Sequence, residues 1–127
     1  MAIRKDMFHK DELKKAEEDF SKVQYKKNQR DIIISLSKVL CEYIPISDVA
    51  MRGFMSSSIR EWQKKEGKTI SDVIQMAPQD RANNVKEMFI NLANRLVKVL
   101  RTSDNEKVVR NGVNSAFDSY VKKFATR

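Results

Sequence analysis

Residues 80–101, DRANNVKEMFINLANRLVKVLR, contain the clearest periodic pattern in the chain. Apolar side chains recur there at intervals of three and four residues, the spacing that places them on one face of an α-helix. The residues of this apolar face are Val85, Met88, Phe89, Leu92, Leu96, Val99 and Leu100. The segment therefore predicts a long helix with one side in a hydrophobic core.

A second helix is predicted immediately downstream. Ser103-Asp104-Asn105-Glu106 has the pattern of a capping box, in which a Ser side chain and an acidic side chain cap the first helical turn. The inward positions of this helix are Val109, Val113, Ala116, Phe117, Tyr120 and Phe124. Two long amphipathic helices joined by a short connection predict an antiparallel helical hairpin at the C-terminal end.

Upstream segments carry apolar stripes of the same kind. Leu13, Ala16, Phe20 and Val23 predict a helix over residues 10–27, and Ile33, Leu36, Leu40 and Tyr43 predict another over residues 29–43. The Ile32-Ile33-Ile34 triplet is also compatible with a strand, but the sequence offers no partner strand. We therefore expect an all-α fold, a single compact domain of five or six helices over residues 10–127, preceded by a flexible N-terminal arm at residues 1–9.

The stretch from Ile46 to Lys65 has the outline of a helix-turn-helix motif. A short helix capped by Ser47-Asp48 is followed by a turn at Gly53 and by a second helix that begins at a run of serines. In that motif the second helix enters the major groove of DNA. The base-facing residues would be Ser56, Ser57, Ser58 and Arg60, with Lys64 and Lys65 on phosphates. The spacing around Gly53 departs from the motif by about one residue, and serine runs more often cap helices than contact bases.

The charge balance points to a polyanionic partner. The chain has 25 Lys and Arg against 17 Asp and Glu, a net charge of +8 on 127 residues. Each phosphate that such a field neutralises releases condensed counterions, which favours binding to nucleic acid. Apolar runs are far shorter than the roughly 20 residues of a membrane span, and the single Cys41 excludes an internal disulfide. We expect a cytoplasmic protein with no membrane partner, and its size and composition favour a bacterial, plasmid or phage source.

Two groups of basic residues are candidates for phosphate contacts. The first is the polar face of the 80–101 helix, where no Asp or Glu occurs between Met88 and Thr102. Its residues are Asn91, Asn94, Arg95, Lys98 and Arg101, and the second group is Lys22, Lys26, Lys27 and Arg30. Arg and Lys bind phosphates, and Asn also reads base edges. A solvated face or the rim of a dimer is the alternative interpretation of both groups.

Residue types needed for catalysis are scarce. His9 is the only histidine, Cys41 falls within a predicted buried helix, and the glycines do not form a phosphate-binding loop. We therefore expect no enzymatic activity, no cofactor, no metal and no small-molecule substrate. Trp62, between Arg60 and Lys64, could be exposed enough to stack on single-stranded bases, although a place in the core is the more common role of such a residue.

These patterns predict a non-enzymatic nucleic-acid-binding protein with an accessory or regulatory role, with DNA preferred over RNA. The alternative is a helical protein–protein interaction module, such as an adaptor, a secretion-associated protein or an assembly subunit. The apolar faces around Ile32-Ile33-Ile34 and Phe117-Tyr120-Phe124 are wide for one small core. A homo-oligomer or a partner helix would cover them in that case.

Overall fold

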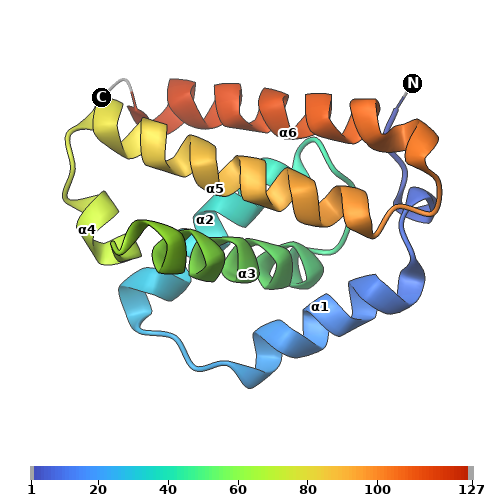
Figure 1. Cartoon of the computed structure of the whole chain (residues 1–127), viewed down its shortest axis with the longest axis horizontal. Helices are drawn as coiled ribbons and strands as arrows, with labels where there is room; N and C mark the ends of the chain where they lie inside the picture. The colour runs from blue at the N-terminus through green and yellow to red at the C-terminus, as the bar shows by residue number, and fades with distance from the viewer. Residues whose placement is uncertain (1, 126–127) are drawn as a thin grey trace.

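In a computed structural model, which describes residues 2–125, the chain folds into six α-helices (Figure 1). They are α1 (Lys10–Lys22), α2 (Lys27–Cys41), α3 (Asp48–Glu66), α4 (Ile70–Ile74), α5 (Pro78–Lys98) and α6 (Glu106–Tyr120). Short 3-10 turns lie at Lys5–Met7 and Ser103–Asn105, and a π-helical turn, Val121–Ala125, follows α6. The predicted all-α class is confirmed, and the only β-pairing among the described residues is an isolated bridge.

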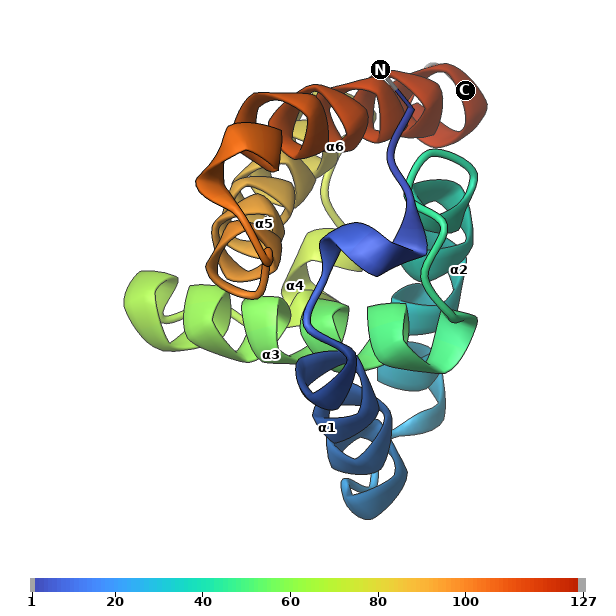
Figure 2. The ribbon, with the colours of Figure 1, turned by 90° about the vertical axis from the view of Figure 1, so that its right-hand side faces the viewer.

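Helix α3 lies at the centre of the arrangement. It packs between α1 on one side and the α5–α6 hairpin on the other, with α2 crossing it (Figures 1 and 2). Its buried residues point in all directions around the helix axis: Ala50, Met51, Gly53, Phe54, Met55, Ser56, Ser58, Ile59 and Trp62. A helix that is covered on every side holds its neighbours in one core.

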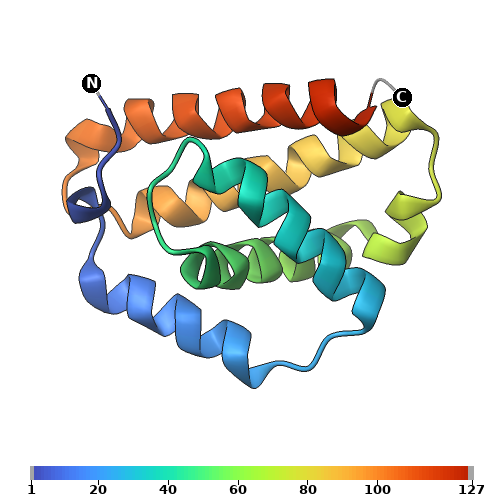
Figure 3. The same ribbon diagram turned by 180° about the vertical axis from the view of Figure 1, so that it is seen from behind.

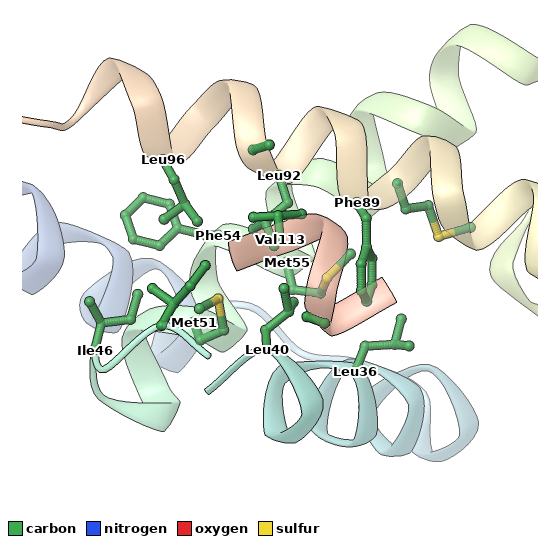
Figure 4. Packing of buried hydrophobic residues seen from close by; sticks show 14 of the residues in the cluster. Leu36, Leu40, Ile46, Met51, Phe54, Met55, Phe89, Leu92, Leu96 and Val113 are labelled. Atoms are coloured by element: carbon green, nitrogen blue, oxygen red, sulfur yellow. The ribbon is translucent and has the colours of Figure 1, made fainter. Parts of the chain in front are cut away.

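The core is built where the helices meet α3. Figure 4 shows side chains of α2, α3, α5 and α6 meeting in this cluster, among them Leu40, Met55, Leu92 and Val113. All four of these side chains are at most 2% exposed. The burial of each side chain of this size stabilises the folded state by roughly 1.5–3 kcal/mol. This cluster therefore provides most of the driving force for folding.

The predicted C-terminal hairpin is confirmed, since α5 and α6 run antiparallel (Figure 1). The ring of Phe89 packs against Phe117 and Tyr120, with centroids 5.9 and 6.3 Å away. The predicted capping box does not form, because Ser103–Asn105 is a 3-10 turn and Asn105 makes no side-chain cap bond to α6. Phe124 was expected to face inward, but it is 46% exposed because the π-helical turn changes the register after Tyr120.

The predicted turn at Gly53 is wrong, because α3 continues without interruption from Asp48 to Glu66. The helix-turn-helix interpretation of this stretch is therefore also wrong. A Cβ at Gly53 would overlap the backbone carbonyl of Ala16. The glycine is thus the point at which α1 reaches the backbone of α3, and this contact offsets the roughly 1 kcal/mol that glycine costs inside a helix.

The segment before α1 packs against the rest of the molecule, whereas the sequence suggests a loose arm over residues 1–9. Met7 and Phe8 are buried at 4% and 2% exposure. Phe8 forms an antiparallel bridge with Leu100, and the N–H of Arg101 donates to the carbonyl of Met7 at 2.8 Å. Figure 2 shows this segment running from beside α6 to the start of α1. Two buried side chains and paired backbone hold it in place.

The two helical glycines give a matched test of this packing. Gly53→Ala should destabilise the protein by about 1–3 kcal/mol, since α1 and α3 must separate to admit the methyl group. At Gly112 the new methyl group would overlap only the end of the Ile3 side chain, at 2.6 Å, which can rotate away, and it would lie at ordinary contact distance, 3.6 Å, from Ile44. Gly112→Ala should therefore change the free energy of unfolding by less than about 1 kcal/mol. Urea denaturation measures both, and equal effects would contradict the α1–α3 contact.

Candidate nucleic-acid interface

Basic residues from three parts of the chain surround one surface hollow of about 870 Å³. We define the basic hollow by its four cationic residues, which are Arg60 and Lys64 of α3, Lys68 of the α3–α4 connection and Arg95 of α5. One acidic residue, Glu61, also lines it. The structure thus brings together three residues predicted from sequence in two separate stretches, namely Arg60, Lys64 and Arg95, and adds Lys68.

Local structure fixes the position of the hollow. Gly67 ends α3 in the left-handed conformation, with φ of 67°, as expected for a glycine that follows a helix. A capping box forms at Thr69: its hydroxyl accepts from the N–H of Asp72, and the Asp72 carboxylate accepts from the N–H of Thr69. The hydrogen bond that the carboxylate accepts from the Thr69 backbone N–H lowers the pKa of Asp72. The connection that carries Lys68 is thereby held at both ends.

The cations of the basic hollow differ in their partners. The Arg95 guanidinium pairs with Glu61 at 2.8 Å, and both side chains are more than one third exposed. An ion pair this exposed is worth about 0–1 kcal/mol and can open. Within residues 2–125, Arg60, Lys64 and Lys68 form no ion pair, although Arg60 donates to the hydroxyl of Ser57 at 3.2 Å. Three cations can therefore bind an anion without first losing an acidic partner.

The rest of the predicted α5 face lies in a different environment. Asn91, Asn94 and Lys98 line a groove of about 880 Å³ between α1, α3 and α5, which we call the mixed-charge groove. Its α1 side carries three carboxylates, Asp11, Glu12 and Asp19, and one cation, Lys15. The absence of acidic residues along the α5 sequence is therefore compensated by α1 in space, and a phosphate in this groove would face carboxylates.

Two further observations reduce the number of residues on the predicted α5 face that are available to bind phosphate. Helix α5 ends at Lys98, so Arg101 is not part of the helical face and instead lines another hollow beside Asp6 and Asp11. The Asn94 side-chain oxygen accepts from Arg110 at 3.0 Å, which occupies that acceptor. Of the five residues predicted on this face, only Arg95 lines the basic hollow.

The predicted group of Lys22, Lys26, Lys27 and Arg30 lies at the α1–α2 connection and does not line the basic hollow. All four residues are exposed, and the Arg30 guanidinium in addition lies over the ring of Phe20, 5.2 Å from its centroid. Tyr25 stacks on the same ring at 5.5 Å. This arrangement gives Arg30 a packing role. Lys65 is also exposed, but it lies outside the hollow.

Of the residues considered for direct contact with bases, Ser56, Ser58 and Trp62 are buried, whereas Ser57 and Arg60 line the basic hollow. Trp62 is 1% exposed and its indole N–H donates to the Glu87 carboxylate at 3.1 Å. Ser58 donates to the carbonyl of Phe54 at 2.8 Å, and Ser56 is hydrogen-bonded to the hydroxyl of Tyr25. These side chains satisfy their polar groups inside the core and are not available to a ligand.

Other chemistry is limited in the part of the chain that the structure describes. It contains no cluster of three His, Cys, Asp or Glu residues able to hold a metal, and no described helix is long and apolar enough to cross a membrane. Burial raises the pKa of Cys41 to about 12, and hydrogen bonding to Asp48 adds to this effect. The Cys41 side chain therefore remains a thiol near neutral pH, which is the unreactive form.

The burial of Trp62 can be tested directly because it is the only tryptophan. Its fluorescence should be poorly quenched by iodide in the native protein and fully quenched after unfolding. Addition of single-stranded DNA should leave the emission unchanged, since no base can stack on a side chain that is 1% exposed. Strong quenching by iodide, or by single-stranded DNA, would contradict this placement.

Comparison of the chain with protein-family models, with curated proteins and with solved structures found no significant match. Its function has to be inferred from its own surfaces. Two of them differ clearly from an ordinary solvated surface, which carries charges of both signs side by side and has few enclosed apolar areas. One is the basic hollow, and the other is an apolar pocket at the junction of α2, α4, α5 and α6.

Proposed function

We propose that this protein is a non-enzymatic nucleic-acid-binding protein that uses the basic hollow to contact the phosphates of duplex DNA. The observation that supports the proposal most strongly is the convergence of Arg60, Lys64, Lys68 and Arg95 on one concave surface. Three of these cations have no acidic partner among the described residues, and the fourth is in an exposed ion pair. The accessory or regulatory role remains part of the same proposal.

The chemistry of the hollow suits phosphates. Arg binds a phosphate through two parallel hydrogen bonds, and Lys acts as a flexible point charge beside it. Ser57 and Thr69 add hydroxyl groups to the same surface, and hydroxyl groups frequently contact phosphate oxygens. Contacts of this kind position a protein on nucleic acid without reading its sequence. We therefore expect binding of low sequence specificity through this hollow.

The composition of the lining favours a duplex over a single strand. Proteins that bind single strands combine basic grooves with aromatic side chains on which the bases stack. No aromatic side chain lines the basic hollow. Trp62, the nearest aromatic candidate in the sequence, points into the core and is bound to Glu87. A ligand that presents its phosphates on the outside and its bases within fits this surface better.

A second candidate, a helical interaction module, is favoured by a separate observation. The apolar residues that the sequence marks as excessive for one core, Ile32, Tyr120 and Phe124, line the same apolar pocket. Within residues 2–125, Phe124 is also among the large apolar side chains that are clearly exposed, at 46%.

Neutralisation of the hollow should abolish most of the binding. In the variant Arg60→Gln/Lys64→Gln/Lys68→Gln, the affinity for random duplex DNA should fall at least ten-fold at low salt. The slope of log K against log salt should decrease by about two to three, since each lost phosphate contact removes about 0.9. Fluorescence anisotropy across a salt series, with duplex DNA, duplex RNA and single-stranded DNA, measures both quantities.

A matched control separates local contacts from net charge. Lys10→Gln/Lys14→Gln/Lys107→Gln removes the same charge from exposed lysines outside the hollow, and it should leave the slope nearly unchanged. Equal losses in both triple variants would refute the proposed site. Thermal unfolding checks that both variants are folded, because Lys64 also lies near the C-terminus of α3, where cations stabilise a helix.

Release of Arg95 from its ion pair with Glu61 provides a test in which the affinity for DNA should increase. Glu61→Gln removes the only carboxylate that lines the hollow and frees the Arg95 guanidinium from its ion pair. The affinity for duplex DNA should rise, by about two- to five-fold for an exposed pair worth under 1 kcal/mol. Lys98→Gln/Arg101→Gln, in contrast, should have a small effect, because both cations lie beside acidic residues outside the hollow. Weaker binding by Glu61→Gln would contradict this assignment.

A further inference from the structure

An apolar pocket of about 250 Å³ lies at the end of the molecule where α4, the start of α5 and the end of α6 come together with α2 (Figure 3). Its wall is mainly aliphatic and aromatic, with Ile32 and Leu36 from α2, Ile70 and Val73 from α4, and Tyr120 from α6. Arg81 of α5 is the only charged residue in the lining. A single cation in a pocket of this composition requires a physical explanation.

Arg81 has no anionic partner within residues 2–125. Its side chain forms no ion pair and no hydrogen bond there, and its Nε atom is buried without an acceptor. Two other arginines have a buried Nε in the same state, but Arg95 pairs with Glu61, and Arg52 lies over the ring of Phe20 at 5.9 Å. A buried donor without a partner costs about 1–3 kcal/mol, more for a charged group. Arg81 differs from these two arginines because its side chain lines an apolar pocket in which the buried Nε–H donor has no acceptor.

The surroundings of Arg81 strengthen its attraction for an anion. Burial raises the pKa of Tyr120, and the positive charge of Arg81 opposes that rise, so the guanidinium acts on the phenol across the pocket wall. Charges interact more strongly where water is excluded than at an exposed surface. The carboxylate of a bound molecule would supply both the missing charge and the missing acceptor.

We propose that this pocket binds a small apolar carboxylate, of the class of medium-chain fatty acids, with its chain among Ile32, Ile70 and Val73 and its carboxylate on Arg81. The pocket is smaller than the roughly 300–1,000 Å³ of sites for drug-sized ligands, which suits one short chain. A bound peptide would need partners for its backbone amides. Besides Arg81, only Ser35 and Tyr120 offer polar side-chain groups in the lining. A free acid needs hydrogen-bond partners only for its carboxylate, and Arg81 provides them.

The test uses octanoate, with octan-1-ol as a probe of the same chain length and no charge. Titration of isotope-labelled full-length protein should shift the methyl signals of Ile32, Ile70, Val73 and Ile74. Octanoate should bind at least ten-fold more tightly than octan-1-ol, since a hydrogen bond to a charged group contributes more than a neutral one. In Arg81→Met, which keeps an apolar chain, octanoate should bind about ten-fold more weakly and octan-1-ol as before.

Controls keep the outcome decisive. Arg60→Met, in the basic hollow, removes an arginine elsewhere and should leave octanoate binding unchanged. The proposal is overturned if octanoate at millimolar concentration shifts none of the four methyl signals, or if octanoate and octan-1-ol bind equally to the unmodified protein. Tighter binding of an acetylated dipeptide that ends in leucine would overturn the assignment to a free acid in favour of a peptide C-terminus.

Discussion

The structure depends on the enclosure of the middle of α3, and in particular on the close approach of α1 to its backbone at Gly53. Because α3 is covered by α1, α2 and α5, every polar side chain on its inner turns must find a partner inside the protein. Ser58 bonds to the carbonyl of Phe54, and Trp62 bonds to Glu87. The enclosure opens towards the C-terminal end of α3, where Arg60 and Lys64 are exposed while Trp62 between them remains buried.

That geometry divides the surface charge of +8 into regions of different character. Where α1 faces α5, carboxylates of α1 balance the cations of α5, and the mixed-charge groove has little net attraction for phosphate. Where α3 leaves the core, Arg60 and Lys64 join Lys68 and Arg95 beside a single acidic residue. The apolar pocket with Arg81 lies at the junction of α2, α4, α5 and α6. The proposed functions of the hollow and the pocket are independent of one another.

The sequence predicted the helices well and the relations between them poorly. Periodicity located the α5–α6 hairpin, and the capping signal at Ser47 correctly marked the start of α3. Gly53 misled because a glycine that ends a helix and a glycine that admits a neighbouring backbone look identical in sequence. The α5 face free of acidic residues misled for a related reason, since Asp11 and Glu12 come from a helix far away in the chain. Lys68 was missed because it follows Gly67 outside any helical pattern.

The central claim is that the basic hollow is the surface that meets nucleic acid. The most direct measurement is a map of backbone amide shifts in isotope-labelled protein during titration with a short random DNA duplex. The proposal predicts shifts concentrated at residues 57–69 and around Arg95, with the exposed faces of α1 and α6 unaffected. Shifts centred on α1, on the α1–α2 connection or on α6, or no shifts at low salt, would contradict it.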